Sequence, residues 1–370
     1  MDRRRHRRVP HLPEEETRPY VRAGEFGGGC RSAGPVPATF PGRSAVLKRA
    51  ATILFPLFLS LTLLAKNPPH PASIERSADL DAALSRIAAE IVSEFAAKGL
   101  TPEGLSISVV NLTQRTPGAP LPAGSYRGDV AYYPASVVKA FYLAYYESRK
   151  EAGKLSDTPE LVRAIHDMIT VSSNDATGFV VDAITDTTSG PEIASARKWK
   201  KWMEKRNAVN RFFLARGYHD LNANQKTFCE DAYGREQVFR DGGKNRNRMT
   251  PDGVARLFKE IARGEIVGPA GTQEMLGLLA RDVTSEKPLE DGELEDARLA
   301  GRKLPPGTRL WAKSGDAYDF HHLVARAILP NGVDFVIAAF TKGVKDVPDV
   351  IPRIYEKVGA QFSAPAAATR

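Results

Sequence analysis

The chain has 370 residues, 42% of them hydrophobic, which is enough for two domains or one large domain with a real core. Its formal net charge is +8, but residues 1–66 hold 12 Lys and Arg against 5 Asp and Glu and so carry most of that excess. A nucleic-acid-binding protein keeps its basic surface on the folded domain, so nucleic acid is excluded as an expected partner.

The first 66 residues have the composition of a leader. Residues 1–42 are rich in Arg, Pro and Gly and are predicted to be disordered, or untranslated if the chain starts near Val46 or Leu47. Residues 43–66 combine a basic flank with an uncharged apolar run, the pattern of a signal peptide. A spanning helix needs about 20 residues, so a cleaved signal is favoured over a membrane anchor. We expect a secreted or periplasmic protein that contacts the membrane only through an uncleaved leader.

Periodic patterns predict one folded domain over residues 77–362, after a linker at 67–76 and before a disordered tail at 363–370. An apolar stripe of Leu80, Leu84, Ile87 and Ile91 predicts a helix over 77–98. A strand is predicted over 105–112 and a Pro/Gly turn region over 113–125. Further helices are predicted over 137–146, 161–170, 250–263 and 349–358, and further strands over 308–313, 322–329 and 334–341.

This order of elements predicts an α+β fold, because helices and strands are segregated along the chain. We expect an antiparallel sheet flanked by helices and formed from both chain ends. An all-α domain of about residues 140–300 is expected as an insertion.

Ser136 and Lys139 lie three residues apart at the start of a predicted apolar helix. Pro134 suits the first position of that helix, and the spacing would let the Ser136 hydroxyl meet the Lys139 amine. A serine needs a neighbouring base to become a nucleophile, and a desolvated lysine can be that base. Taken alone, the pair is weak evidence, because this spacing is common by chance.

Two further motifs follow in order: Ser172-x-Asn174, and Lys313-Ser314-Gly315. With Ser136-x-x-Lys139, they form the ordered set of serine β-lactamases and penicillin-binding proteins. From about residue 77 to 360 the chain resembles that superfamily, and the class A β-lactamase branch most closely. The resemblance implies a β-lactamase/transpeptidase-like fold.

The resemblance also implies roles for the motif residues. Ser136 would become acylated, with Lys139 as the proton acceptor or as an electrostatic partner of the base. Ser172 would pass a proton to the leaving nitrogen, and Asn174 would bond Lys139 or the substrate. Lys313 and Ser314 would bind the substrate carboxylate, Gly315 would leave room for the substrate, and the backbone N–H groups of Ser136 and Asp316 would form the oxyanion hole. Alternatively, Ser172 and Asn174 cap the next helix and Lys313 is a solvated strand lysine.

One motif of class A enzymes is missing. Their E-x-x-L-N glutamate activates the water that removes the acyl group. Here the matching region after Tyr218 has no such motif. Glu230 is the best candidate base and Asp220 is the second candidate, but either carboxylate is also well explained as a surface charge. The interval between the first two motifs is also short for class A, which predicts a missing wall of the cleft.

Other features are assigned no chemistry. The segment from 197 to 248 begins with a basic-aromatic run around Trp199 and Trp202, whose favoured interpretation is a helix with a solvated basic face, the alternative being a surface for acidic polymers or membranes. His321 and His322 point to opposite faces of a strand, so no metal site is assigned, and no cofactor is expected. Cys229 is the one cysteine outside the leader, and no internal disulfide is expected.

The expected function is that of a serine hydrolase acting through an acyl-enzyme, with β-lactam hydrolysis as the leading activity. The alternatives are a D,D-peptidase or esterase, and a binding or sensor domain that is acylated and stays acylated. The expected partner is a small-molecule β-lactam or a cell-wall peptide, and a monomer is expected.

Overall fold

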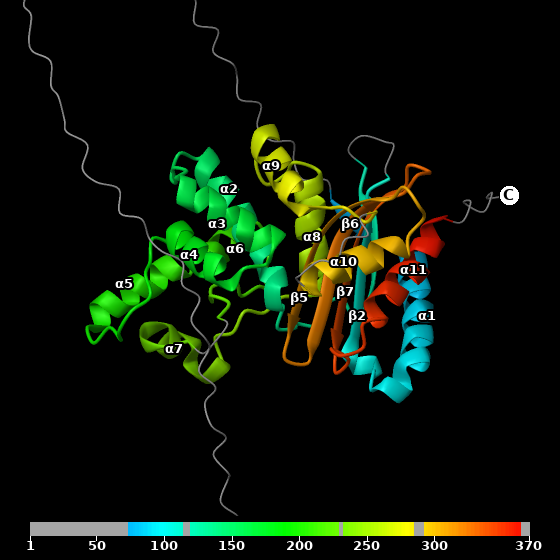
Figure 1. Ribbon diagram of the computed structural model, residues 1–370, viewed down its shortest axis with the longest axis horizontal. Helices are drawn as coiled ribbons and strands as arrows, with labels where there is room; N and C mark the ends of the chain where they lie inside the picture. The colour runs from blue at the N-terminus through cyan, green and yellow to red at the C-terminus, as the bar shows by residue number, and fades with distance from the viewer. Residues whose placement is uncertain (1–72, 114–118, 229–231, 285–291, 364–370) are drawn as a thin grey trace, which may run out of the picture. The chain divides into compact units, whose positions relative to one another are not determined.

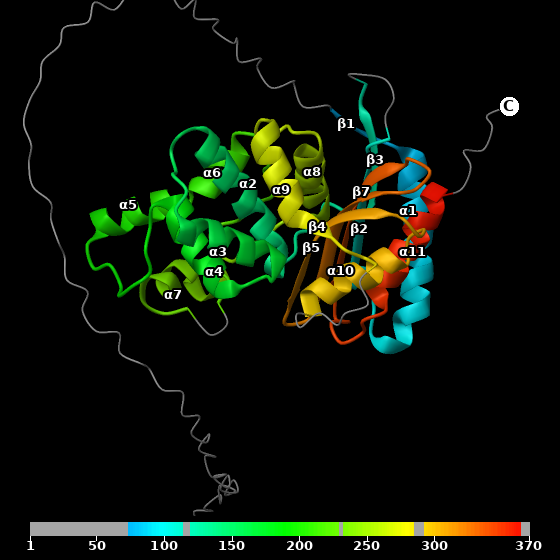
Figure 2. The same cartoon turned by 45° about the horizontal axis from the view of Figure 1, so that its top comes forward.

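The computed structural model describes residues 73–113, 119–228, 232–284 and 292–363. Seven strands form one sheet in the order β1-β3-β2-β7-β6-β5-β4 (Figure 1). They are β1 (Ile74–Arg76), β2 (Leu105–Asn111), β3 (Leu121–Tyr126), β4 (Ala280–Arg281), β5 (Arg309–Ala317), β6 (Phe320–Ile328) and β7 (Asp334–Lys342). Both ends of the domain therefore contribute strands, as predicted. The sheet is mixed rather than purely antiparallel, because β1 pairs parallel to β3 (Figure 2).

Helices cover both faces of the sheet. On one face lie α1 (Ala78–Phe95), α10 (Gly292–Arg302) and α11 (Val350–Ser363); α11 contacts both other helices, and all three contact the strands. On the other face α8 (Pro251–Ala262) packs against β2, β7 and β6. Along β7 the buried side chains alternate between the two layers, with Val336 and Phe340 in one core and Phe335 and Ile337 in the other. This is the period of two that a strand covered on both faces requires.

The described chain between β3 and β4 is largely helical, and these helices gather at one side of the sheet (Figure 1). They are α2 (Val138–Glu151), α3 (Pro159–Thr170), α4 (Asn174–Thr185), α5 (Ala196–Arg206), α6 (Ala208–Leu214), α7 (Gly234–Arg240), α8 and α9 (Pro269–Leu279). α2 is buried along most of its length. Its core is continuous with the α8 face of the sheet, so the two regions share one hydrophobic cluster.

The strongly periodic elements were predicted correctly. α1 begins after Ser77, whose Oγ accepts from Leu80 N at 3.4 Å, and α8 begins after Thr250, whose side chain accepts from Gly253 N at 3.1 Å. The strands predicted near the C-terminus correspond to β5, β6 and β7.

Three short strands were missed. β1 lies in the predicted linker, β3 lies in the predicted turn region, and the two-residue β4 lies where no strand was predicted. The sequence of β3, LPAGSY, contains Pro and Gly, which are depleted in strands. Gly124 is required by packing, since a Cβ there would lie 2.5 Å from Leu80 Cβ on α1.

The predicted leader, most of the predicted tail, Cys229 and Glu230 lie outside the described residues. The secretory signal therefore stays a prediction. Within the part of the chain that the structure describes, no helix is both long and apolar enough to cross a bilayer.

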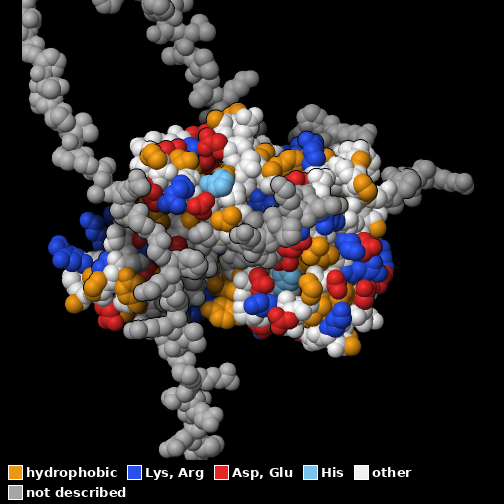
Figure 3. All heavy atoms as spheres, in the orientation of Figure 1, with side chains coloured by type: hydrophobic (Ala, Val, Ile, Leu, Met, Phe, Trp, Pro, Cys, Tyr) orange, Lys and Arg blue, Asp and Glu red, His pale blue; other side chains and the backbone are white. Residues whose placement is uncertain are grey.

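α5 is the predicted basic-aromatic helix, and the interpretation of a solvated face is right for most of it. Lys198, Lys200, Lys201 and Lys205 are exposed, and Figure 3 shows basic side chains at the end of the molecule where α5 lies. Arg206 is the exception, because it is fully buried.

Arg206 is the centre of a buried ion cluster. Its guanidinium donates to both Glu236 oxygens at 2.8 and 3.0 Å and to Asp182 Oδ1 at 2.7 Å. Lys226 Nζ contacts the other Asp182 oxygen at 2.5 Å and Ser189 Oγ at 2.7 Å. The cluster therefore joins α4, α5 and α7 to the segment that contains Lys226.

We expect Glu236→Ala to lower the free energy of unfolding by about 3–5 kcal/mol, because it leaves Arg206 buried without its main partner. Urea unfolding followed by circular dichroism measures this change. The control is Glu204→Ala, an exposed site on α5, which should shift stability by less than about 0.5 kcal/mol. Equal effects of the two variants would contradict the assigned role of the cluster.

Candidate active site

Ser136 lies on a tight turn at the start of α2. Residues Ala135–Val137 form a 3₁₀ turn, and α2 proper begins at Val138. The prediction that Ser136 sits in the first turn of an α-helix, with Pro134 as its first residue, was therefore slightly wrong: Pro134 caps the 3₁₀ turn instead. Ala135 adopts φ +46°, a left-handed conformation that is uncommon for residues other than glycine. We call residues 134–137 the nucleophile turn.

Strand β5 is pressed against the nucleophile turn at Gly315. A Cβ at Gly315 would lie 2.6 Å from the Pro134 carbonyl oxygen and 2.8 Å from Ser136 N. Real Cβ atoms essentially never approach so closely, so only glycine permits this contact. Gly315 is therefore needed for the packing of β5 against the nucleophile turn, in addition to its predicted role of leaving room for the substrate.

Two buried lysines converge on Ser172. Lys139 Nζ donates to Ser172 Oγ at 3.0 Å and to Asn174 Oδ1 at 2.9 Å, and it also bonds the Ser172 carbonyl. Lys313 Nζ donates to the same Ser172 Oγ at 2.9 Å. Lys139 is 0% and Lys313 1% exposed, so the alternative of a solvated strand lysine is wrong. The predicted contact between Ser136 and Lys139 is not seen among the hydrogen bonds of the described residues.

The alternative role for Ser172 and Asn174, capping the next helix, is also wrong. The cap of α4 is Ser173, whose Oγ accepts from Ala176 N at 3.2 Å. Ser172 adopts φ +53° immediately before it. Both flanking residues are thereby left to contact Lys139.

A cavity of about 250 Å³ opens at the nucleophile turn. Its described lining includes Ser136, Asn174 and Asp316 from the three motif regions, together with Tyr133, Ala135, Thr227, Phe228, Ala317 and Tyr318. The candidate base Glu230 lies outside the described residues, two positions after Phe228.

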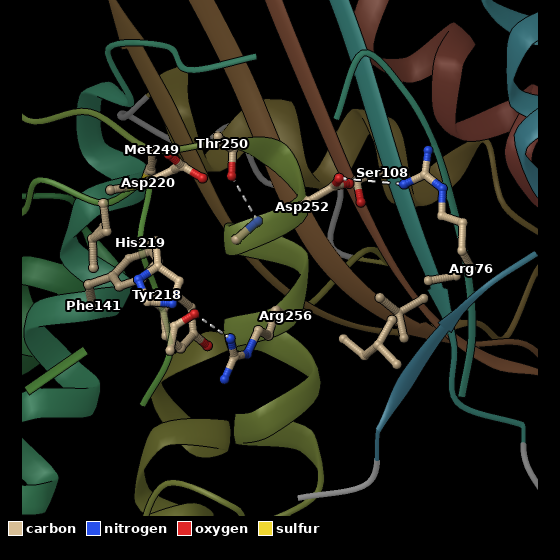
Figure 4. A pocket seen from close by; sticks show the side chains of 16 residues that line it. Arg76, Ser108, Phe141, Tyr218, His219, Asp220, Met249, Thr250, Asp252 and Arg256 are labelled. Carbon is tan, nitrogen blue, oxygen red and sulfur yellow. Dashed lines mark hydrogen bonds and ion pairs between the residues drawn. The ribbon is translucent and has the colours of Figure 1, made fainter. Parts of the chain in front are cut away.

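A second cavity, of about 300 Å³, lies beside α8 and strands β1, β2 and β3 (Figure 4). Figure 4 shows Asp220, Tyr218 and Arg256 among its lining residues. The two cavities share no described lining residue. The structure therefore does not bring Asp220 together with Ser136, which removes the support for Asp220 as a reserve base.

His322 supports the nucleophile turn, a role that the sequence did not indicate. Its Nε2 donates to the Tyr133 carbonyl at 3.0 Å, and its Nδ1 accepts from Thr341 N at 3.2 Å. Burial lowers the pKa of His322 to about 3, which keeps the ring neutral with its proton on Nε2. The adjacent His321 faces the other way and contacts Asp296 at 2.9 Å.

The nucleophile turn between a sheet edge and helices, with two buried lysines behind it, defines a serine hydrolase of the β-lactamase and penicillin-binding protein superfamily. A model described as the β-lactamase enzyme family matches residues 158–361, more than half of the chain. The chain therefore belongs to the β-lactamase enzyme family. A comparison with curated proteins gives no match.

Solved structures show the same fold at low sequence identity. The structure of PBP-A aligns with a TM-score of 0.53 and 18% sequence identity. The alignment covers 79% of this chain and 99% of the PBP-A chain. A β-lactamase from Sphaerobacter thermophilus DSM 20745 is 20% identical, with a TM-score of 0.54, over 76% of this chain and 98% of its own. A variant of the last common ancestor of Gram-negative bacteria β-lactamase class A has 18% identity and a TM-score of 0.52, over 75% and 98%.

His322→Gln tests the buried imidazole through the pH dependence of stability. Because the pKa is lowered on folding, the contribution of neutral His322 is complete above pH 6.5 and is lost as the pH falls toward 3. A glutamine amide can donate to Tyr133 but does not titrate. Urea unfolding from pH 7.5 to 4 should therefore show a steeper acid loss in wild type than in the variant. Parallel curves would contradict this assignment.

Proposed function

We propose that this serine hydrolase opens the ring of β-lactams by forming an acyl-enzyme on Ser136. Water then hydrolyses this acyl-enzyme and releases the product. The observation that carries the proposal is the convergence of Lys139 and Lys313 on Ser172 Oγ, behind the cavity that contains Ser136. A purely structural lysine pair would be expected at the surface or beside carboxylates. Here two buried ammonium positions share a hydroxyl at a cavity.

Lys139 is the proposed proton acceptor. Two ammonium groups bonded to one hydroxyl repel each other, which favours the neutral form of one of them. A neutral Lys139 could take the Ser136 proton after a small movement, since catalytic contacts are often long in unliganded enzymes. The Ser136 Oγ–carbonyl carbon bond forms and the amide C–N bond breaks. Ser172 delivers its hydroxyl proton to the leaving nitrogen and regains one from Lys139, whose Nζ donates to Ser172 Oγ at 3.0 Å. The proton taken from Ser136 is thereby passed to the nitrogen.

The backbone N–H groups of Ser136 and Asp316 are the proposed oxyanion hole. The close approach of Gly315 to the nucleophile turn supports this, because it brings the residue before Asp316 against Ser136 N. Loss of one such donor typically costs about 10²–10³ in turnover. The predicted binding of a substrate carboxylate by Lys313 and Ser314 stays a prediction, because both residues are buried beneath the strand surface.

A penicillin-binding or sensor activity is the second candidate, and the missing E-x-x-L-N motif favours it. PBP-A, whose fold this chain shares, is known as an acyl-enzyme complex with penicillin G in one mutant form. Both candidates require acylation of Ser136 and differ in deacylation. A D,D-peptidase or esterase activity would use the same acyl-enzyme with another acyl donor.

Ser136→Ala should abolish covalent labelling by a fluorescent penicillin, because no other hydroxyl occupies the nucleophile position. Gel fluorescence measures the label, and circular dichroism checks that the fold is retained. The control is Ser173→Ala, which removes a neighbouring hydroxyl that caps α4 and should leave labelling in place. Persistent labelling of the Ser136→Ala protein would refute the mechanism.

If Glu230 is the deacylating base, Glu230→Gln should slow hydrolysis of the acyl-enzyme by at least about 10²-fold without slowing its formation. Stopped-flow measurement with a chromogenic cephalosporin should then show a burst of one equivalent followed by a slow steady state. A variant with unchanged steady-state turnover would exclude Glu230 from this step.

A further inference from the structure

Arg246 lies beside the cavity of Ser136 with its charge uncompensated by any described carboxylate. Its guanidinium carbon is 4.2 Å from the centre of the Tyr133 ring and 4.7 Å from that of Tyr318. None of the ion pairs formed by the described residues involves Arg246, which is half-buried. Cation–π contact with two rings holds the guanidinium in place without neutralising it.

The surroundings of Arg246 are basic. It lines a small polar cavity of about 50 Å³ together with Lys226 and Arg240, and the described lining contains no Asp or Glu. Lys226 is already bonded to Asp182 within the buried ion cluster. This cavity and the cavity of Ser136 share Tyr133, Phe228 and Tyr318. Arg246 therefore lines a cavity whose wall is shared with the cavity of Ser136.

The contacts of Arg246 with two aromatic rings indicate which kind of ligand it can bind. A guanidinium has five N–H donors, so contact with the two tyrosines leaves N–H groups of Arg246 that match a carboxylate in a bidentate manner. Burial raises the pKa of Tyr133, so its ring stays neutral and favourable to the cation. Two aromatic rings and an arginine thus make a site for a carboxylate attached to an apolar or aromatic group.

The direction of β5 places this site relative to a substrate. Lys313 and Ser314 precede Asp316 on the strand, and Tyr318 lies directly after the strand's last residue, Ala317. A strand rises by about 3.3 Å per residue. A substrate whose carbonyl lies at the N–H groups of Ser136 and Asp316 can therefore extend its acyl side chain toward Tyr318 and away from Lys313.

We propose that Arg246, held by Tyr133 and Tyr318, is a specificity residue that binds a carboxylate on the acyl side chain of the substrate. The preferred substrates are then dianionic, with one carboxylate on each side of the reacting carbonyl. This inference rests on the proposed function, since it deepens the substrate class of the same site.

Benzylpenicillin and carbenicillin form a matched pair of probes, because carbenicillin carries one additional side-chain carboxylate. The full chain and its variants are mixed with each penicillin, and the second-order acylation rate constant is measured. Arg246→Ala should lower the carbenicillin-to-benzylpenicillin ratio by about tenfold or more, the usual effect of losing a charge-assisted hydrogen bond. Arg246→Lys should lower it less, since the charge remains without the fork.

Arg248→Ala is the matched control. Arg248 is exposed, lies two residues away, and lines neither cavity. The Arg248→Ala substitution removes one positive charge, as Arg246→Ala does, and should leave the carbenicillin-to-benzylpenicillin ratio unchanged. An equal loss for both penicillins in Arg246→Ala, an unchanged ratio, or an equal fall in Arg248→Ala would overturn the proposal.

Failure of both penicillins to acylate the wild-type chain would count against the proposed β-lactam activity and not against the subsite. Phenylboronic acid and 3-carboxyphenylboronic acid then replace them, because boronates require only the Ser136 hydroxyl. Calorimetry should show tighter binding of the carboxylated compound, lost in Arg246→Ala and kept in Arg248→Ala. No preference, no binding of either boronate, or a preference that survives Arg246→Ala would overturn the proposal.

Discussion

The close approach of β5 to the nucleophile turn is the contact on which the candidate site depends. Any side chain at Gly315 would collide with the backbone of Pro134 and Ser136. This one missing Cβ brings a strand built from the C-terminal part of the chain against the start of α2. The sheet and the helices thereby share a cavity wall, and Asp316 comes to line the same cavity as Ser136.

The site also concentrates strain and buried charge. Ala135, Ser172 and Tyr318 all have positive φ values, of 46°, 53° and 60°, and they lie at or beside the cavity. Such conformations persist only where the surrounding structure fixes them. Hydrogen bonds supply this fixation: His322 donates to the Tyr133 carbonyl, and Ser172 and Asn174 accept from Lys139.

Buried charges also support the site. The buried ion cluster around Arg206 anchors Lys226, which is followed by Thr227 and Phe228 of the cavity wall. Two buried lysines are tolerated because each has hydrogen-bond partners, as burial of a charge demands.

The sequence predicted those parts of the fold whose signals are local. The three motifs identified Ser136, Lys139, Ser172 and Lys313, and clear periodicity located α1, α8 and the three strands at the C-terminal side. The missed features depend on contacts between distant segments. β3 contains a glycine because α1 lies on it, and Arg206 is buried because Glu236 and Asp182 meet it. His322 and Arg246 gained their roles from Tyr133, which is more than 100 residues away from each. No local pattern in the sequence could have indicated those pairings.

A time course of intact mass with benzylpenicillin, followed by peptide mapping, tests the central claim most directly. We predict a single adduct located on Ser136, which forms rapidly and then clears as penicilloic acid accumulates. An adduct on another residue, or product formed with Ser136 never modified, would contradict it.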